Sequence, residues 1–93
     1  MADMVYSRTL ISGSVQGVGF RYFVTSRAER YGITGFVRNL DTGGVELEVE
    51  GDKKDVYDFL MEIKRGPTHA EIVAFQTEWR TYQKKYDTFF VKY

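Results

Sequence analysis

Two glycines and an arginine lie close together where a strand-like pattern gives way to a helix-like one. The segment SVQGVGFR, residues 14–21, contains Gly17 and Gly19 and ends on Arg21. Backbone N–H groups in such a turn can form a concave anion site, and the free N–H groups of a helix start add to it. A cation at a helix start is unfavourable by itself, because the N–H groups there are already positive. A bound anion would explain Arg21, whose planar guanidinium suits phosphate.

The glycine spacing around this turn does not by itself identify the ligand. With Gly13 included, the spacing is G-x-x-x-G-x-G, which is neither the dinucleotide-binding fingerprint nor a Walker loop. A strand-to-helix bend with Arg21 turned toward solvent is therefore an alternative interpretation.

A second polar residue of interest, Asn39, ends the strand-like segment 33–39 just before the turn sequence LDTGG. Its side-chain carbonyl and amide could hold a water molecule beside a bound anion. Asparagine before a turn also commonly bonds its own backbone, and this alternative stays open. The preceding residue, Arg38, should alternate to the opposite face of the strand, so we interpret it as structural or surface-exposed.

The order of the predicted elements defines the fold class. Apolar spacing and turn residues predict strands over 4–12, 33–39, 45–50, 70–79 and 88–93, and helices over 20–31 and from Asp52 to Gly66-Pro67. The order β-α-β-β-α-β with a short C-terminal strand is typical of the ferredoxin-like split βαβ sandwich of the α+β class. We expect residues 1–93 to form one domain, an antiparallel sheet with two helices on one face.

This topology predicts a contact that the linear sequence hides. The first and second strands should run parallel with the third between them, so that their C-terminal ends share one edge of the sheet. Arg21 and Asn39 should therefore be neighbours. In the third strand, VELEVE, the alternation predicts that the aliphatic side chains face the core and that Glu46, Glu48 and Glu50 face water.

Composition narrows the classes of function. The chain has 93 residues, no cysteine, one histidine, and 13 basic against 13 acidic residues. The absence of cysteine excludes disulfides and thiolate chemistry and favours a cytoplasmic setting, and residues 1–6 lack the features of a signal peptide. Zero net charge disfavours nucleic-acid binding. A single histidine disfavours a histidine metal site or triad, and we expect no metal, cofactor or membrane span.

Taken together, the two segments around Arg21 and Asn39 resemble the acylphosphatase family. The matching blocks are SVQGVGFRYF and GITGFVRNLDTGGVELEVEG, and the likeness continues through RGPTHAEIV and TFFVKY. The resemblance implies that Arg21 binds substrate in catalysis and that Asn39 positions the attacking water. It also implies a phosphate cradle made by the backbone of Val15, Gln16, Gly17, Val18, Gly19 and Phe20. Phe36 stands at a position where many members of the family have tryptophan.

The resemblance implies an enzyme that hydrolyses the carboxyl-phosphate anhydride of a small acyl phosphate to a carboxylate and inorganic phosphate. We expect in-line attack by water without a metal, a monomer, and inorganic phosphate or sulfate as a ligand of the site. Two other classes are alternatives: a non-catalytic anion-binding or regulatory module, and a nucleic-acid-binding ferredoxin-like domain. An acylphosphatase-like domain also begins the large carbamoyl-transferring hydrogenase maturation proteins, but a stand-alone enzyme is the simpler expectation for this chain.

Overall fold

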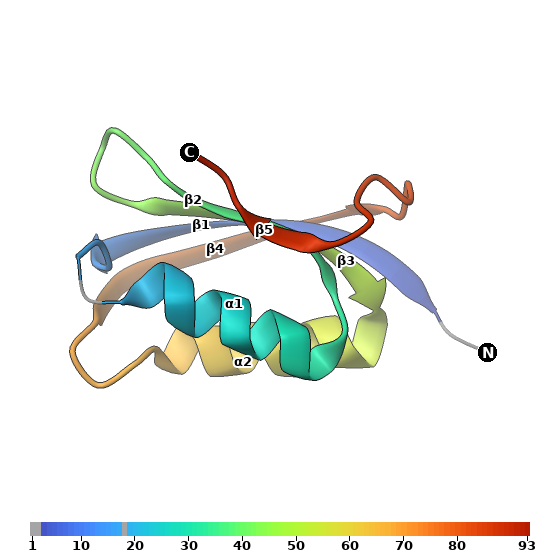
Figure 1. Cartoon of the computed structure of the whole chain (residues 1–93), viewed down its shortest axis with the longest axis horizontal. Helices are drawn as coiled ribbons and strands as arrows, with labels where there is room; N and C mark the ends of the chain where they lie inside the picture. Colours follow the sequence, from blue (N-terminus) through green and yellow to red (C-terminus); the bar gives the residue numbers. More distant parts are fainter. Residues whose placement is uncertain (1–2, 18) are drawn as a thin grey trace.

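Five strands and two helices make up the fold in the computed structural model, which describes residues 3–17 and 19–93. The elements are β1 (Met4–Ser14), α1 (Phe20–Tyr31), β2 (Thr34–Asn39), β3 (Val45–Asp52), α2 (Lys53–Arg65), β4 (Glu71–Thr81) and β5 (Phe89–Val91). Both helices lie on one face of the sheet (Figure 1). The predicted β-α-β-β-α-β order with a short final strand is therefore confirmed.

The sheet has the strand order β4-β1-β3-β2-β5. β3 pairs antiparallel with β1 on one side and with β2 on the other, so β1 and β2 run parallel to each other, as predicted. The expectation of a wholly antiparallel sheet is wrong at one edge, because β5 pairs parallel with β2. The reason is the connection after β4, which carries the chain to the opposite edge of the sheet before β5 begins (Figure 1).

The buried residues of each helix recur every three or four positions and therefore lie on one face. In α1, Phe20, Val24 and Ala28 are buried, and the helix ends at Gly32, whose φ of 65° is readily adopted by glycine. In α2 the buried residues are Val56, Phe59, Leu60 and Ile63. The Asp52 side chain caps α2 by accepting a hydrogen bond from the backbone N–H of Lys54 at 3.0 Å. Neither helix is long and apolar enough to cross a membrane within the part of the chain that the structure describes.

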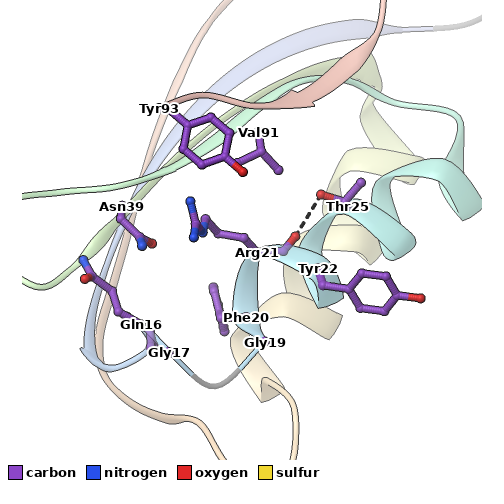
Figure 2. A pocket seen from close by; sticks show the side chains of 11 residues that line it. Gln16, Gly17, Gly19, Phe20, Arg21, Tyr22, Thr25, Asn39, Val91 and Tyr93 are labelled. Carbon is purple, nitrogen blue, oxygen red and sulfur yellow. Dashed lines mark hydrogen bonds between the residues drawn. The ribbon is translucent and has the colours of Figure 1, made fainter.

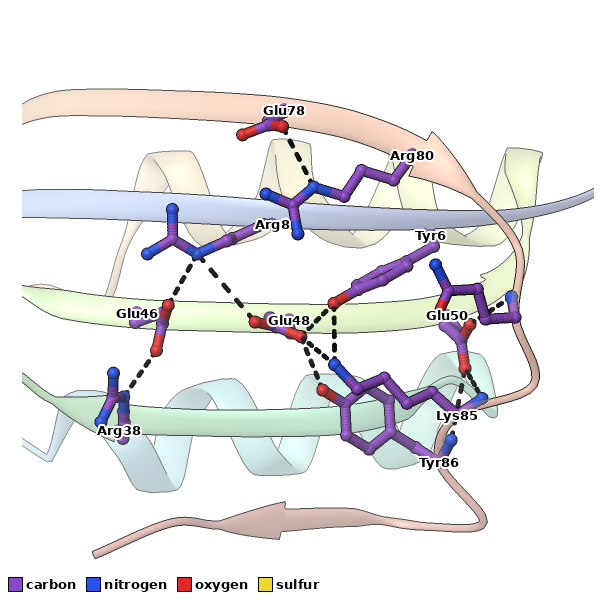
Figure 3. A network of polar contacts seen from close by, with 11 residues as sticks. Tyr6, Arg8, Arg38, Glu46, Glu48, Glu50, Glu78, Arg80, Lys85 and Tyr86 are labelled. Atoms are coloured by element: carbon purple, nitrogen blue, oxygen red, sulfur yellow. Dashed lines mark hydrogen bonds and ion pairs between the residues drawn. The ribbon is translucent and has the colours of Figure 1, made fainter.

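Both faces of β3 are buried, which corrects the expectation that its glutamates face water. Glu46, Glu48 and Glu50 are only 4%, 8% and 1% exposed. They do point away from the helices, but long side chains of the neighbouring strands and the segment after β4 cover them (Figure 3). An alternating sequence shows which residues share a face of a strand, but not what covers that face.

Each of the outer two glutamates has charged or backbone partners. Glu46 accepts from the Nε atoms of Arg8 at 2.7 Å and Arg38 at 2.5 Å, which gives Arg38 the structural place expected for it. The carboxylate of Glu50 accepts backbone N–H groups from the segment between β4 and β5, namely those of Gln83 at 2.9 Å, Lys85 at 2.6 Å and Tyr86 at 3.3 Å. These hydrogen bonds supply the partners that a buried carboxylate needs. They also attach the segment between β4 and β5 to β3.

Glu48 lies at the centre of the network (Figure 3). Its Oε1 accepts hydrogen bonds from the hydroxyls of Tyr6 and, at 2.6 Å, Tyr86. Burial acts to raise the pKa of Glu48, but the two hydroxyls and the nearby Lys85 and Arg8 outweigh it and lower the pKa below its ordinary value. Burial and Glu48 in turn raise the pKa of Tyr86, which therefore remains a donor.

We predict that Glu48→Gln lowers the free energy of unfolding at pH 7 by about 1–3 kcal/mol, because hydrogen bonds to a charged acceptor are lost. A carboxylate whose pKa is lowered by folding stabilises the protein above its unfolded pKa, near 4.5, and loses that effect as the pH falls through its folded pKa. The difference in the free energy of unfolding between the wild type and Glu48→Gln should therefore become smaller below pH 4.5. Urea unfolding across pH measures it.

The matched control for this prediction is Glu29→Gln, at an exposed position of α1. It should leave the free energy of unfolding close to that of the wild type at every pH. A Glu48→Gln deficit that stays constant between pH 7 and pH 3 would contradict the assignment of the effect to the ionised carboxylate.

Candidate active site

A cavity of about 380 Å³ opens where the C-terminal ends of β1 and β2 meet the start of α1. Its lining comes from the loop between β1 and α1, the first turns of α1, the end of β2, and the chain from β5 to the C-terminus. Arg21 and Asn39 both line it, so the expected proximity of these residues is confirmed (Figure 2). Their chemical roles remain predictions.

The loop between β1 and α1 is held by buried side chains at both ends. Val15 and Phe20 are 0% and 1% exposed and pack in the core. Between them Gly17 and Gly19 have φ angles of 75° and 72°, a region that favours glycine. The predicted cradle residue Val18 lies outside the described residues. The loop thus has both ends fixed in the core, as a preorganised binding loop requires.

The start of α1 is suited to an anion. Its N-cap residue is Gly19, which has no side chain with which to cap the first N–H groups of the helix. Such free N–H groups, with the helix dipole, attract negative charge. Arg21 takes part in none of the ion pairs formed among the described residues. Backbone and side chain therefore present positive charge on the same wall of the cavity.

Asn39 projects into the cavity from the last position of β2 (Figure 2). Its Oδ1 atom is buried and accepts no hydrogen bond from any residue that the structure describes. The alternative in which this oxygen bonds its own turn is therefore not observed. A buried carbonyl oxygen without a partner is costly, so this atom is available to a water molecule or a ligand.

Sequence reasoning missed four lining residues, Tyr22, Thr25, Val91 and Tyr93. Thr25 donates its hydroxyl to the carbonyl oxygen of Arg21 at 2.8 Å, within α1. Val91 and Tyr93 come from the C-terminal strand and its extension, and the Tyr93 ring centroid lies 5.3 Å from Cζ of Arg21. No local signal in the sequence places Val91 and Tyr93 at the cavity, because β5 reaches it only through its pairing with β2.

The arrangement can bind a tetrahedral oxyanion. A guanidinium, a glycine turn at a helix start and a side-chain amide converge on one opening, and phosphate is recognised by such groups. In the described ranges 3–17 and 19–93, no three His, Asp or Glu side chains are placed to hold a metal ion. The single histidine of the sequence, His69, lies in the turn before β4 and does not line the cavity.

Comparison with known proteins adds independent evidence. The family model described as acylphosphatase matches residues 7–91. An acylphosphatase from Bacillus pumilus (strain SAFR-032) is 42% identical over 89 residues, which are 96% of this chain and 99% of that protein. The crystal structure of the acylphosphatase from Bacillus subtilis superimposes with a TM-score of 0.92 at 30% identity, covering 96% of this chain and 99% of that one.

A larger protein contains the same fold. The crystal structure of full-length HypF in its phosphate- and nucleotide-bound form matches with a TM-score of 0.86 at 34% identity, over 99% of this chain but only 12% of that one. The family model and the relatives of similar length agree over nearly the whole chain. The chain is an enzyme of the acylphosphatase family.

Proposed function

We propose that this protein hydrolyses the carboxyl-phosphate anhydride of acyl phosphates to a carboxylate and inorganic phosphate. The observation that carries the proposal is the shared cavity, in which Arg21 and Asn39 lie beside the 15–20 loop and the start of α1. Membership of the acylphosphatase family supports the same reaction. We take residues 1–93 to form one domain that acts as a monomer, since every group assigned to the reaction comes from one chain. The absence of cysteine from the sequence favours a cytoplasmic setting.

In the proposed complex, the phosphoryl group binds to the backbone N–H groups of residues 15–20 and to the Arg21 guanidinium. The transition state of phosphoryl transfer spreads negative charge over the phosphoryl oxygens, so fixed donors stabilise it more than they stabilise the substrate. Inorganic phosphate or sulfate should bind in the same place. The HypF structure, which is in a phosphate- and nucleotide-bound form, is consistent with anion binding in a related protein.

The orientation of the attacking water is assigned to Asn39, whose unpartnered Oδ1 can accept a hydrogen bond from it. Attack in line with the scissile bond forms the new P–O bond as the bond to the carboxylate oxygen breaks. The leaving group is a carboxylate, which is stable at neutral pH, so the reaction needs neither a general acid nor a metal. The proton of the water passes to a phosphoryl oxygen of the substrate.

The alternatives make different predictions. A regulatory anion-binding module needs the cradle and Arg21 but has no use for a water-binding amide at Asn39. A nucleic-acid-binding domain is disfavoured by the zero net charge of the chain. The similarity to one segment of HypF leaves a role as one domain of a larger protein as the second candidate, and catalysis by this chain alone tests it.

We predict that the purified protein hydrolyses a simple acyl phosphate, such as acetyl or benzoyl phosphate, at the same rate with and without EDTA. A phosphate monoester should not be cleaved, because its alkoxide leaving group needs a proton or a metal. Phosphate release measures both reactions. Cleavage of the monoester without cleavage of the acyl phosphate would contradict the proposal.

We predict that Arg21→Ala lowers kcat/KM by about 10²–10³-fold, the usual effect of removing one donor to an oxyanion. Binding of inorganic phosphate, measured by calorimetry, should weaken in parallel. Arg21→Lys should rescue only part of the loss, because an ammonium lacks the planar fork. The matched control is Arg30→Ala, on the same helix with a side chain 62% exposed, which should behave as wild type.

We predict that Asn39→Ala lowers kcat by about 10²-fold, because the water loses its orientation, while inorganic phosphate still binds. Steady-state kinetics and calorimetry on one preparation separate the two effects. Near-normal turnover by this variant would show that Asn39 does not position the nucleophile.

A further inference from the structure

The turn between β2 and β3 follows directly after Asn39 and is closed by its own backbone. Leu40 N–H donates to the Gly44 carbonyl at 2.8 Å, and Gly43 N–H donates to the Leu40 carbonyl at 3.0 Å. At Gly44 a side chain would lie 2.6 Å from the Ile11 carbonyl oxygen of β1, so the turn packs closely on that strand. This turn is thus a compact unit, and its place determines where Asn39 sits.

Gln16, in the loop between β1 and α1, reaches this turn with its side chain. Its Nε2 donates to the Leu40 carbonyl at 2.9 Å and to the Gly44 carbonyl at 2.8 Å. A primary amide nitrogen has two hydrogens, so both donors are used. The two acceptors are the same carbonyls that close the turn, and each therefore receives two hydrogen bonds.

We propose that the Gln16 side chain is a positioning residue that couples the anion-binding loop to Asn39. This inference rests on the proposed function, because it concerns the placement of the attacking water. The role is separate from that assigned to the Gln16 backbone N–H, which belongs to the phosphate cradle and is present whatever the side chain.

The missing hydrogen-bond partner of the Asn39 Oδ1 atom among the described residues explains why such a brace is needed. Its Oδ1 makes no hydrogen bond to any described residue, so no polar contact of that atom fixes its distance from the loop. The backbone on either side must therefore fix it. β2 pairing holds Asn39 opposite Val45. The two Gln16 bonds hold the next residue, Leu40, and the turn residue Gly44 to the loop that would bind the phosphoryl group.

A brace of this kind has a kinetic signature. In-line attack depends on the placement of the water relative to phosphorus, and a displacement of about 1 Å can cost about 10²-fold in rate. Phosphate binding depends on Arg21 and on the loop N–H groups, which the Gln16 side chain does not touch. Loss of the brace should therefore lower kcat and leave KM and phosphate affinity nearly unchanged.

The test uses Gln16→Met, an unbranched side chain of similar length without hydrogen-bond donors, in the full-length protein. We expect kcat for acetyl phosphate to fall about 10- to 100-fold, with little change in KM. Gln16→Asn keeps the amide but is one methylene short, and it should show the same loss. Gln76→Met, at an exposed position of β4, is the matched control and should keep wild-type kinetics. Wild-type kcat in either Gln16 variant would overturn the proposal.

A second measurement does not depend on activity. In ¹H–¹⁵N spectra of the wild type, inorganic phosphate should shift the amide signals of the 15–20 loop and of residues 40–44. In Gln16→Met the loop signals should still shift and the turn signals should not. Turn shifts that persist in the variant would overturn the coupling. Failure of the wild type to hydrolyse acyl phosphates, with the turn shifts still dependent on Gln16, would reject the proposed function and leave the coupling in place.

Discussion

The double pairing of β3, with β1 on one side and β2 on the other, is the constraint on which the rest of the structure depends. Because β1 and β2 both run antiparallel to β3, their C-terminal ends point the same way and lie at the same end of the sheet. The loop that leads into α1 and the turn after β2 both start from this end. β3 itself contributes no residue to the lining of the cavity. Its pairing with β1 and β2 nevertheless brings Arg21 and Asn39 to the same cavity.

The charges of the protein are separated by this arrangement. The buried carboxylates of β3 lie on the face of the sheet that the helices do not cover, where arginines, tyrosines and backbone N–H groups surround them (Figure 3). The start of α1, by contrast, combines free N–H groups with Arg21. A guanidinium engaged by an internal carboxylate would bind an external anion weakly, so the separation leaves Arg21 for the ligand.

The parts that make up the site differ in how far they are buried and paired. Val15 and Phe20 fix the ends of the anion-binding loop in the core, and the pairing of β2 fixes Asn39. The C-terminal extension that carries Tyr93 reaches the cavity only along the three-residue β5, and the Tyr93 side chain is almost fully exposed. The groups assigned to the phosphoryl reaction are thus on the most constrained parts, as precise positioning requires.

The order of the elements, the apolar faces of both helices and the neighbourhood of Arg21 and Asn39 followed from the sequence, because periodicity, caps and turn residues act over a few positions. Only the tertiary structure decided that Glu48 is buried, that β5 runs parallel to β2, and that the Gln16 side chain reaches the turn after Asn39. Each of these depends on contacts between segments far apart in the chain. Local patterns specify which residues share a face, whereas long-range packing determines what that face meets.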